Sequence, residues 1–497
     1  MQRKNRPIIE HNKDVIYAMY YSKVNISDSS TFTNLVLLFT GFVIVNIVTL
    51  NNPANLLLTI PQYIIVLFFL VKNNIRDSVL SHFAFTILSL SAQKTLGMFE
   101  TEDFLLYNYG TLKLIGPIRA CYAMNLVFTL ILLHSKLKVR KDLLYYKLYK
   151  VFLCLFIPAS IIGVIGVALH PFYTFDKLLD KEIYAYVVLT SMYIILKVAN
   201  DRFIQVAYYI CLSGIMAGIF GSFFCFITGL TVSHYSVFDI AYMSDITYLT
   251  PMLIIGVIMV KQRALLLLTL VIYFFFATTV LAGKEVFSIA FCLFFLLYCY
   301  FFRTGNKKRS PFVTILMFGV VGLLVGLVIH IQGNTGSTMA SYKLHSAFSM
   351  MTGNIDDAGR SPYIRMAQLA NILYEGLQNP FLLIFGNGYG GYFEDKLGLF
   401  ANVDLLNGAY NFKTVGSGRF HSGHDAVVNI PFFNGLVGMW LVLRISWKYI
   451  KKIRFNYMNS AIFLWVLLIF YFNTIFAYIG LFALIGAEYK VNKVNMM

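Results

Sequence analysis

The chain contains 497 residues, of which 58% are hydrophobic and 13% are charged, and its formal net charge is +17. Soluble globular proteins contain about 25% charged residues, so this composition excludes an ordinary soluble enzyme and predicts a protein that lies mostly in a membrane. The positive charge does not indicate nucleic-acid binding, because the basic residues form no compact basic domain. They gather instead in short connections between apolar runs.

Apolar runs of about 20 residues, long enough to cross a bilayer as helices, follow one another along most of the chain. The last of them, 459–487, is long for one helix and short for two, so we expect 13 or 14 transmembrane helices. The expected fold class is therefore an all-α polytopic membrane protein. The other runs lie at 31–50, 54–71, 78–93, 117–134, 149–169, 183–199, 203–228, 245–260, 263–282, 285–302, 311–331 and 425–447.

The connections between these runs differ in charge on alternate sides of the membrane. Lys and Arg total 25 in the set that includes the N-terminal segment, and 6 in the short connections of the other set. Because basic connections stay in the cytoplasm, we expect a cytoplasmic N-terminus in a bacterial inner membrane. The predicted parts are a cytoplasmic segment 1–30, a membrane domain 31–332 of about 11 helices, a large external (periplasmic) loop 333–424 with short helices, and C-terminal membrane helices 425–497.

The external loop contains a well-marked helix. Ser361 and Pro362 predict its start, and Asn379-Pro380 predicts its end. Apolar residues recur three or four positions apart, which predicts one apolar face. That face consists of Met366, Ala370, Leu373 and Leu377.

Two arginines lie at the start of this helix, Arg360 just before it and Arg365 in its first turn. Unpaired N–H groups and the partial positive charge of a helix N-terminus favour anions. With two guanidinium groups beside it, this end is a candidate phosphate site. In the alternative interpretation, Arg365 pairs on the loop surface with one of the carboxylates Asp356, Asp357 and Glu375.

Two further stretches of the loop are candidates for chemistry. The run from Phe385 to Gly391 (Phe-Gly-Asn-Gly-Tyr-Gly-Gly) lets the backbone approach a phosphate or a sugar closely, although a plain turn explains it as well. The loop then ends at His421 and His424, where a histidine can take a proton from a hydroxyl near neutral pH. The alternatives for this pair are a capping role at the membrane interface and a metal site, which has no matching external Cys or His set.

The order and spacing of these motifs carry a family resemblance. Arg365 opens a helix, Pro380 follows after fifteen residues, Phe385–Gly388 forms a Phe-Gly-x-Gly turn, and His424 lies eleven residues before a Gly-x-x-Gly at 435–438. This stretch resembles the signature region of the O-antigen polymerase and O-antigen ligase superfamily. The chain departs from that pattern in lacking the tryptophan often found after the helix arginine, and in having Asp425, instead of the commoner Asn, after the histidine.

The resemblance implies a glycosyltransferase of GT-C-like architecture that uses an undecaprenyl-pyrophosphate-linked oligosaccharide as donor and as acceptor. It implies inverting, metal-independent polymerisation of repeat units, with His424 as general base and no cofactor. Lys284 stands where the family has an arginine near the end of an earlier helix. The cations expected to bind the pyrophosphate are Lys284, Arg360, Arg365, Arg419 and Arg119, and His421 and Asp425 are secondary candidates. The implied partners are membrane lipid, a flippase and a chain-length regulator.

Three alternatives stay open at this point. A ligase would transfer the finished glycan to lipid A-core or another acceptor, and the sequence does not separate it from a polymerase. A metal-dependent transferase would use the acidic run 100–103. A polysaccharide transporter or flippase would place charged residues in the middle of its spans, whereas here the charges lie near the ends of the spans and in one loop.

Overall fold

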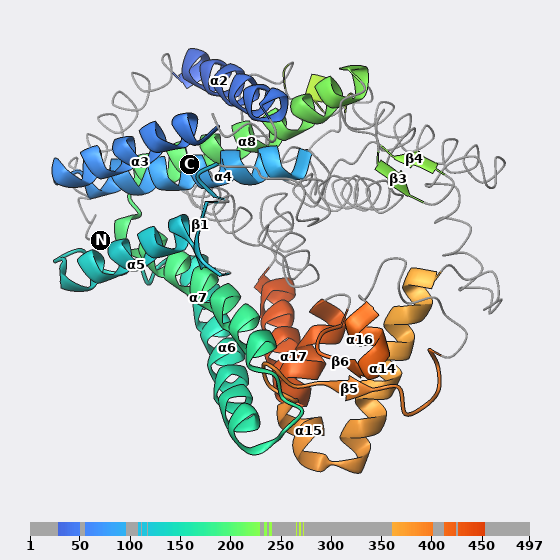
Figure 1. Ribbon diagram of the computed structural model, residues 1–497. Helices are drawn as coiled ribbons and strands as arrows, with labels where there is room; N and C mark the ends of the chain where they lie inside the picture. The colour runs from blue at the N-terminus through green and yellow to red at the C-terminus, as the bar shows by residue number, and fades with distance from the viewer. Residues whose placement is uncertain are drawn as a thin grey trace, which may run out of the picture.

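The chain is mostly helical in a computed structural model (Figure 1). Its helices include α2 (Asp28–Val48), α3 (Asn55–Val71), α4 (Ile75–Thr95), α5 (Ala120–His134), α6 (Leu144–Leu169), α7 (Phe175–Val198), α8 (Asp201–Thr228), α14 (Arg360–Gln378), α15 (Pro380–Phe385), α16 (Phe412–Ser417) and α17 (Ala426–Lys452). The structure describes residues 28–49, 55–95, 108–110, 112–116, 118–228, 233–235, 238–240, 265, 268, 269, 272, 360–400, 412–423 and 426–452.

Helices lie at eight of the predicted apolar runs, from α2 at 31–50 to α8 at 203–228 and again at α17. Two of them, α6 and α8, contain stretches that are long and apolar enough to cross a membrane. Shorter apolar stretches occupy α2, α3, α5 and α17. The number of spans and their orientation stay predictions, because the N-terminal segment 1–27 and most of 245–331 and 453–497 lie outside the described residues.

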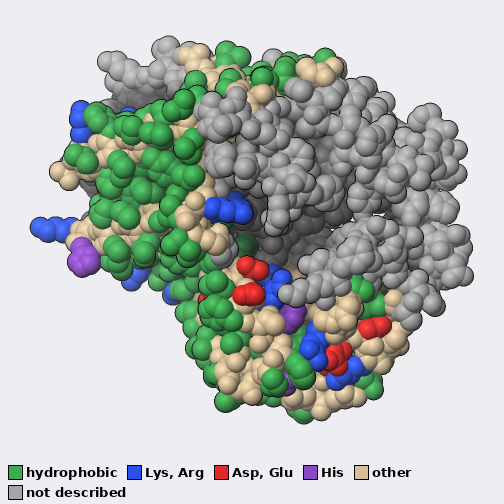
Figure 2. Space-filling model, viewed as in Figure 1, with side chains coloured by type: hydrophobic (Ala, Val, Ile, Leu, Met, Phe, Trp, Pro, Cys, Tyr) green, Lys and Arg blue, Asp and Glu red, His purple; other side chains and the backbone are tan. Residues whose placement is uncertain are grey.

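The described helices form two groups joined by the hairpin of α6 and α7 (Figure 1). Helix α8 packs on α2 and α4, and α3 packs on α4. Helix α7 contacts α5 and α6, and α6 in turn contacts α17 of the other group, which also holds α14 and α15. In Figure 2 hydrophobic side chains cover most of the described surface of the first group, whereas charged and histidine side chains gather on the second.

Three short antiparallel hairpins accompany the helices in the described part of the chain, and the sequence analysis predicted none of them. They are β1 (Lys113–Ile115) with β2 (Ile118–Arg119), β3 (Ser233–Tyr235) with β4 (Phe238–Ile240), and β5 (Phe393–Glu394) with β6 (Arg419–Phe420). The last strand pair joins the stretch just after the glycine-rich run to the end of the predicted external loop, and it pairs Glu394 with Arg419.

The start of α14 differs from the predicted one by a residue or two. The helix begins at Arg360, so Arg360 belongs to its first turn and Ser361 is not the N-cap. Asn379-Pro380 ends the helix as predicted, and it also begins α15. The Asn379 side chain accepts a hydrogen bond from the Phe381 N–H, and Pro380 occupies the first turn of α15.

The predicted apolar face of α14 is the exposed one. Leu377 is 73% exposed and Met366 is 58% exposed, whereas Asn371 and Glu375 are buried. The polar side is buried because it finds partners there. Asn371 Nδ2 donates to Asp395 Oδ1 at 2.8 Å, and Glu375 Oε1 accepts from the Glu394 N–H at 3.0 Å.

A chain of polar side chains crosses the core of the first group. Tyr109 donates to Nδ1 of the fully buried His82 at 2.7 Å, and His82 Nε2–H donates to Asn125 Oδ1 at 2.9 Å. Asn125 Nδ2 donates onward to Ser191 Oγ at 3.0 Å. The Asn125 amide fixes this direction, since its nitrogen is used on Ser191 and its oxygen must accept. The chain therefore ties α4, α5, α7 and the segment before β1 together.

We predict that His82→Ala destabilises the protein, because it removes the ring that bonds to both the Tyr109 hydroxyl and the Asn125 side-chain oxygen in the buried core. The expected loss of unfolding free energy is about 1–3 kcal/mol, measured as a lower midpoint of thermal unfolding in detergent. His134→Ala is the matched control, since His134 is exposed and bonds only within α5. Equal midpoints for the two variants would show that the polar chain does not hold the helices together.

Candidate functional site

The glycine-rich segment Gly386–Gly391 is buried between α6 and α17. The Tyr389 N–H donates to the Ala159 carbonyl of α6 at 2.9 Å. The Asn387 N–H donates to the Phe432 carbonyl of α17 at 2.7 Å, and the Gly388 N–H donates to Phe433 at 3.2 Å. The described glycines thus allow the segment to pack closely against the two helices. This agrees with a structural role for them and not with the alternative, a contact to a phosphate or a sugar.

Helix α17 supplies these carbonyls because it is broken beside the segment. Gly435 lies in the middle of α17 with φ 58°, outside the helical region, and Pro431 precedes it by one turn. A break in a helix leaves carbonyls of the preceding turn without their usual partners. A methyl group at Gly435 would lie 2.7 Å from the Gly386 nitrogen. The Phe-Gly-x-Gly and Gly-x-x-Gly motifs that carry the family resemblance are therefore in contact.

Helix α6 accommodates the segment at Gly163. A methyl group built there would lie 2.2 Å from the Tyr389 carbonyl oxygen, so no other residue fits without moving the backbone. Asn434 strengthens the same junction by donating from Nδ2 to the Leu155 carbonyl at 2.6 Å. The junction of α6, α17 and the glycine-rich segment fixes the position of the residues that follow Gly391.

We predict that Gly163→Ala lowers the free energy of unfolding by about 1–3 kcal/mol, the usual cost of overpacking. Gly41→Ala in α2 is the control, because a methyl group at Gly41 meets nothing within 4 Å and alanine favours a helix. Thermal unfolding of the two purified variants measures the difference. A Gly163→Ala variant as stable as Gly41→Ala would contradict the close approach.

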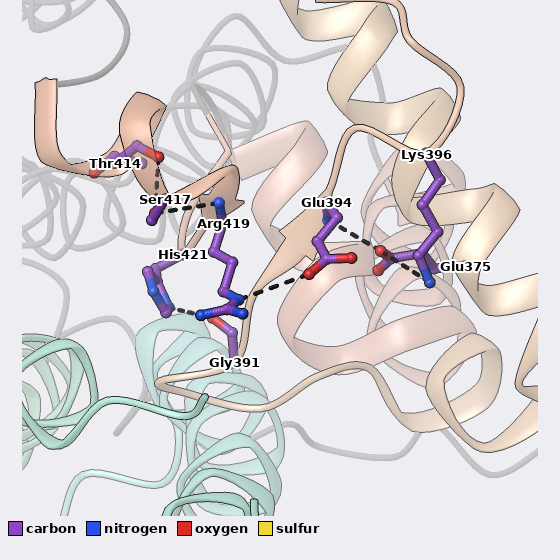
Figure 3. A network of polar contacts seen from close by, with 8 residues as sticks. All are labelled: Glu375, Gly391, Glu394, Lys396, Thr414, Ser417, Arg419 and His421. Atoms are coloured by element: carbon purple, nitrogen blue, oxygen red, sulfur yellow. Dashed lines mark hydrogen bonds and ion pairs between the residues drawn. The ribbon is translucent and has the colours of Figure 1, made fainter. Parts of the chain in front are cut away.

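A network of polar contacts extends from the glycine-rich segment along the β5–β6 hairpin (Figure 3). Lys396 Nζ lies 3.8 Å from Oε1 of Glu375, the same oxygen that accepts from the Glu394 N–H. Arg419 Nε lies 3.7 Å from Glu394 Oε1 across the hairpin. Burial raises the pKa of the Glu375 carboxyl, and Lys396 and the Glu394 N–H offset part of that increase.

Arg419 is held against aromatic rings as well as against Glu394. Its guanidinium carbon lies 3.6 Å from the ring centre of Phe172 and 5.6 Å from that of Tyr392. Phe172 belongs to the turn between α6 and α7, so this contact joins the predicted external loop to the end of α6. Such cation–aromatic contacts fix the plane of the guanidinium. The Arg419 side chain stays 32% exposed.

His421 lies beside Arg419 and Gly391 (Figure 3). Its Nδ1 lies 3.0 Å from the Gly391 carbonyl oxygen. A carbonyl can only accept, so Nδ1 carries the hydrogen and Nε2 of the neutral ring keeps its lone pair. Burial lowers the pKa of His421, and the nearby positive charges of Lys177 and Arg419 lower it further against the opposing hydrogen bonds to the backbone. The ring is therefore a neutral base at pH 7.

The turn between α6 and α7 completes this cluster. Tyr173 donates from its hydroxyl to the Asn387 carbonyl at 3.0 Å, and burial raises the Tyr173 pKa to about 12. The rings of His170 and Tyr392 lie 6.0 Å apart. Lys177, in the first turns of α7, is exposed and close enough to act on His421. We call Lys177, Arg419 and His421, with Phe172 and Tyr392, the cation–histidine cluster.

The predicted site residues fall into four groups. Arg419 and His421 lie together in the cation–histidine cluster. Arg365 is half-buried in α14, whose C-terminal half contacts the same network, and Arg360 begins that helix. Arg119 lies in the other helix group, before α5, and donates to the Gly110 carbonyl at 3.1 Å. The three remaining predicted residues, Lys284, His424 and Asp425, lie outside the described residues.

Sequence reasoning missed Lys177, Phe172 and Tyr173. All three lie in the short connection 170–182, which the charge pattern assigned to the same side as the large loop. Their predicted location on the same side of the membrane as the loop was the one signal in the sequence that they could contact it. The contact itself was not predictable, because these residues lie more than 200 residues before Arg419 and His421.

Within the described part of the chain, no three His, Cys, Asp or Glu side chains come together as a set of metal ligands. The acidic run 100–103 lies outside that part.

Comparisons of the chain with protein-family models, with curated proteins and with solved structures found no match.

Proposed function

We propose that the protein is a membrane glycosyltransferase that polymerises oligosaccharide repeat units carried on a polyprenyl pyrophosphate. The observation that carries the proposal is the cation–histidine cluster at the end of α6, a helix apolar and long enough to cross a membrane. A neutral imidazole beside an arginine and a lysine suits a reaction in which a hydroxyl loses a proton while a diphosphate gains charge. The order of the motifs from Arg365 to Gly438 supports the same reaction.

The proposed reaction is one displacement at the anomeric carbon of the donor glycan. The acceptor hydroxyl oxygen forms a bond to that carbon, and its proton passes to an imidazole nitrogen. The bond from the carbon to the phosphate oxygen breaks, and the polyprenyl diphosphate leaves with the electron pair. Attack opposite the leaving group inverts the configuration. Arg419 and Lys177 stabilise the charge that develops on the diphosphate.

Two histidines compete for the role of base. The resemblance favours His424 through its spacing to Gly435, whereas the hydrogen bond to Gly391 gives His421 a free Nε2 lone pair. Arg365 and Arg360 lie on α14, which contacts β5, and they would extend the cationic surface toward a long substrate. Lys284 would add a charge from an earlier helix if the family pattern holds. No step requires a metal when arginine and lysine neutralise the diphosphate.

We predict that removing the base slows chain extension about 10²–10⁴-fold. Purified protein in lipid vesicles is incubated with a polyprenyl-pyrophosphate oligosaccharide, and products are separated on a gel. Ladders of increasing length mark a polymerase, single transfers to lipid A-core mark a ligase, and no product from any donor contradicts both. His421→Ala and His424→Ala then identify the base, with His134→Ala as a control outside the site.

We also predict how the rate depends on pH. The pKa of His421 is lowered from the usual 6.5 of a histidine. If His421 is the base, kcat/KM should therefore fall only when the pH drops through this lowered pKa. Lys177→Ala removes a positive charge that disfavours the imidazolium, so it should raise this pKa and move the acid limb of the kcat/KM profile to higher pH. Lys396→Ala, an exposed lysine engaged with Glu375, should leave the limb in place. An acid limb at the same pH in the unmodified protein, Lys177→Ala and Lys396→Ala would exclude His421 as the base.

A further inference from the structure

The glycine-rich segment contacts α6 far from the end of that helix. Ala159, which accepts from the Tyr389 N–H, precedes Leu169, the last residue of α6, by ten residues. At 1.5 Å per residue, this contact lies about 15 Å along the helix from its end. If α6 crosses the membrane, the segment reaches about half-way into a hydrocarbon layer that is roughly 30 Å thick.

The position along α17 gives a somewhat smaller depth, about 10 Å from the start of that helix at 1.5 Å per residue. The segment bonds to Phe432 and Phe433, six and seven residues into α17, and α15 packs against the next turn at Gly435. Asn434 in turn reaches Leu155 of α6. Two independent helices thus place α15 and the segment beside the apolar middle of α6, below the level of the turn at Phe172.

The outer side of this assembly is apolar and uncovered. On α15, Phe381 is 53% exposed, and Ile384 and Phe385 are also exposed. Leu377 at the end of α14 continues this surface. Helix α6 has the same character, with Ile161 and Val164 both 55% exposed. The exposed faces of α6, α15 and α17 therefore present hydrocarbon side chains where a water-facing loop would present polar ones.

The backbone of the segment satisfies the condition for irregular structure inside a bilayer. In hydrocarbon every N–H must find a partner within the protein. The N–H groups of Gly386, Asn387, Gly388 and Tyr389 donate to Leu382, Phe432, Phe433 and Ala159. These internal bonds allow the buried segment to lie inside the bilayer, although a buried segment needs them in water as well.

We propose that α15 and the segment Gly386–Tyr389 form a re-entrant element embedded in the outer half of the bilayer, with the hydrocarbon tails of membrane lipids covering the exposed face of α15. The inference rests on the proposed membrane location of α6. It revises the sequence-based view of 333–424 as wholly outside the membrane, because it assigns Pro380–Tyr389 to lipid. The cation–histidine cluster would then lie at the membrane surface, above the part of the chain that enters the bilayer.

Spin labels test this placement in the full chain, reconstituted in phosphatidylethanolamine and phosphatidylglycerol vesicles after replacement of the six native cysteines. Phe381→Cys and Ile384→Cys carry the labels on α15. Val164→Cys on α6 is the lipid-facing control, and Lys396→Cys in the polar network is the water-facing control. Collision rates with oxygen, which concentrates in lipid, and with an uncharged nickel chelate, which stays in water, are measured by electron paramagnetic resonance.

We expect the labels at 381 and 384 to match Val164→Cys, with oxygen collisions dominant, and to differ from Lys396→Cys. Nickel access at 381 and 384 with oxygen access at 164 would overturn the re-entrant element and leave the proposed function standing. Shielding from both reagents at 381 and 384 would mean that protein covers the face, which also overturns it. Water access at 164 would remove α6 from the bilayer, and the membrane premise of the proposed function with it.

A second measurement guards against misfolding of the cysteine-free chain. Phe385→Trp is placed in a chain whose Trp440, Trp447 and Trp465 are replaced by Phe. Lipids brominated on their acyl chains should quench its fluorescence, and aqueous iodide should not. Quenching by iodide alone would contradict the proposal.

Discussion

The arrangement of the second helix group depends on backbone hydrogen bonds between the glycine-rich segment and two helices. Tyr389 bonds to Ala159 of α6, and Asn387 and Gly388 bond to the broken turn of α17. These bonds require that α6 have no side chain at Gly163 and that α17 leave the helical conformation at Gly435. Together with the Tyr173–Asn387 hydrogen bond and the Arg419–Phe172 contact, they hold Arg419 and His421 beside the turn at Phe172.

The chemistry of the cluster follows from what surrounds its two central side chains. Glu394 and the rings of Phe172 and Tyr392 orient Arg419 and leave one side of it open. The Gly391 carbonyl sets the tautomer of His421, and burial, with a smaller effect of Lys177 and Arg419, lowers the pKa of the ring and keeps it neutral. The same positive charge that keeps the histidine a base would also attract a diphosphate, so one arrangement serves both substrates of the proposed transfer.

Sequence reasoning succeeded where one physical property decides the outcome. The lengths of apolar runs located α2 to α8 and α17, and Asn379-Pro380 located the end of α14. It did not identify the inner face of α14, because periodicity reveals an apolar face but not whether a neighbouring element covers it. Asn371 and Glu375 face inward because the chain at Glu394 and Asp395 offers them hydrogen-bond partners. Those partners lie about twenty residues away, so the spacing within the helix does not reveal them.

The candidate site was only partly predictable for a related reason. Arg419 and His421 were found because they lie close together in a polar stretch, and the family pattern pointed to the same region. Phe172 lies in the turn between α6 and α7 and Lys177 at the start of α7, both more than 200 residues earlier, and their part in the site depends on how α6 packs against α17. No spacing rule in a single sequence encodes that packing.

A structure of the protein in a lipid nanodisc with a polyprenyl diphosphate bound tests the account most directly. The account predicts density for the diphosphate in contact with the Arg419 guanidinium and the Lys177 ammonium, with His421 Nε2 facing the sugar side. Diphosphate density bound beside Arg119 in the first helix group, with the cation–histidine cluster empty, would contradict it.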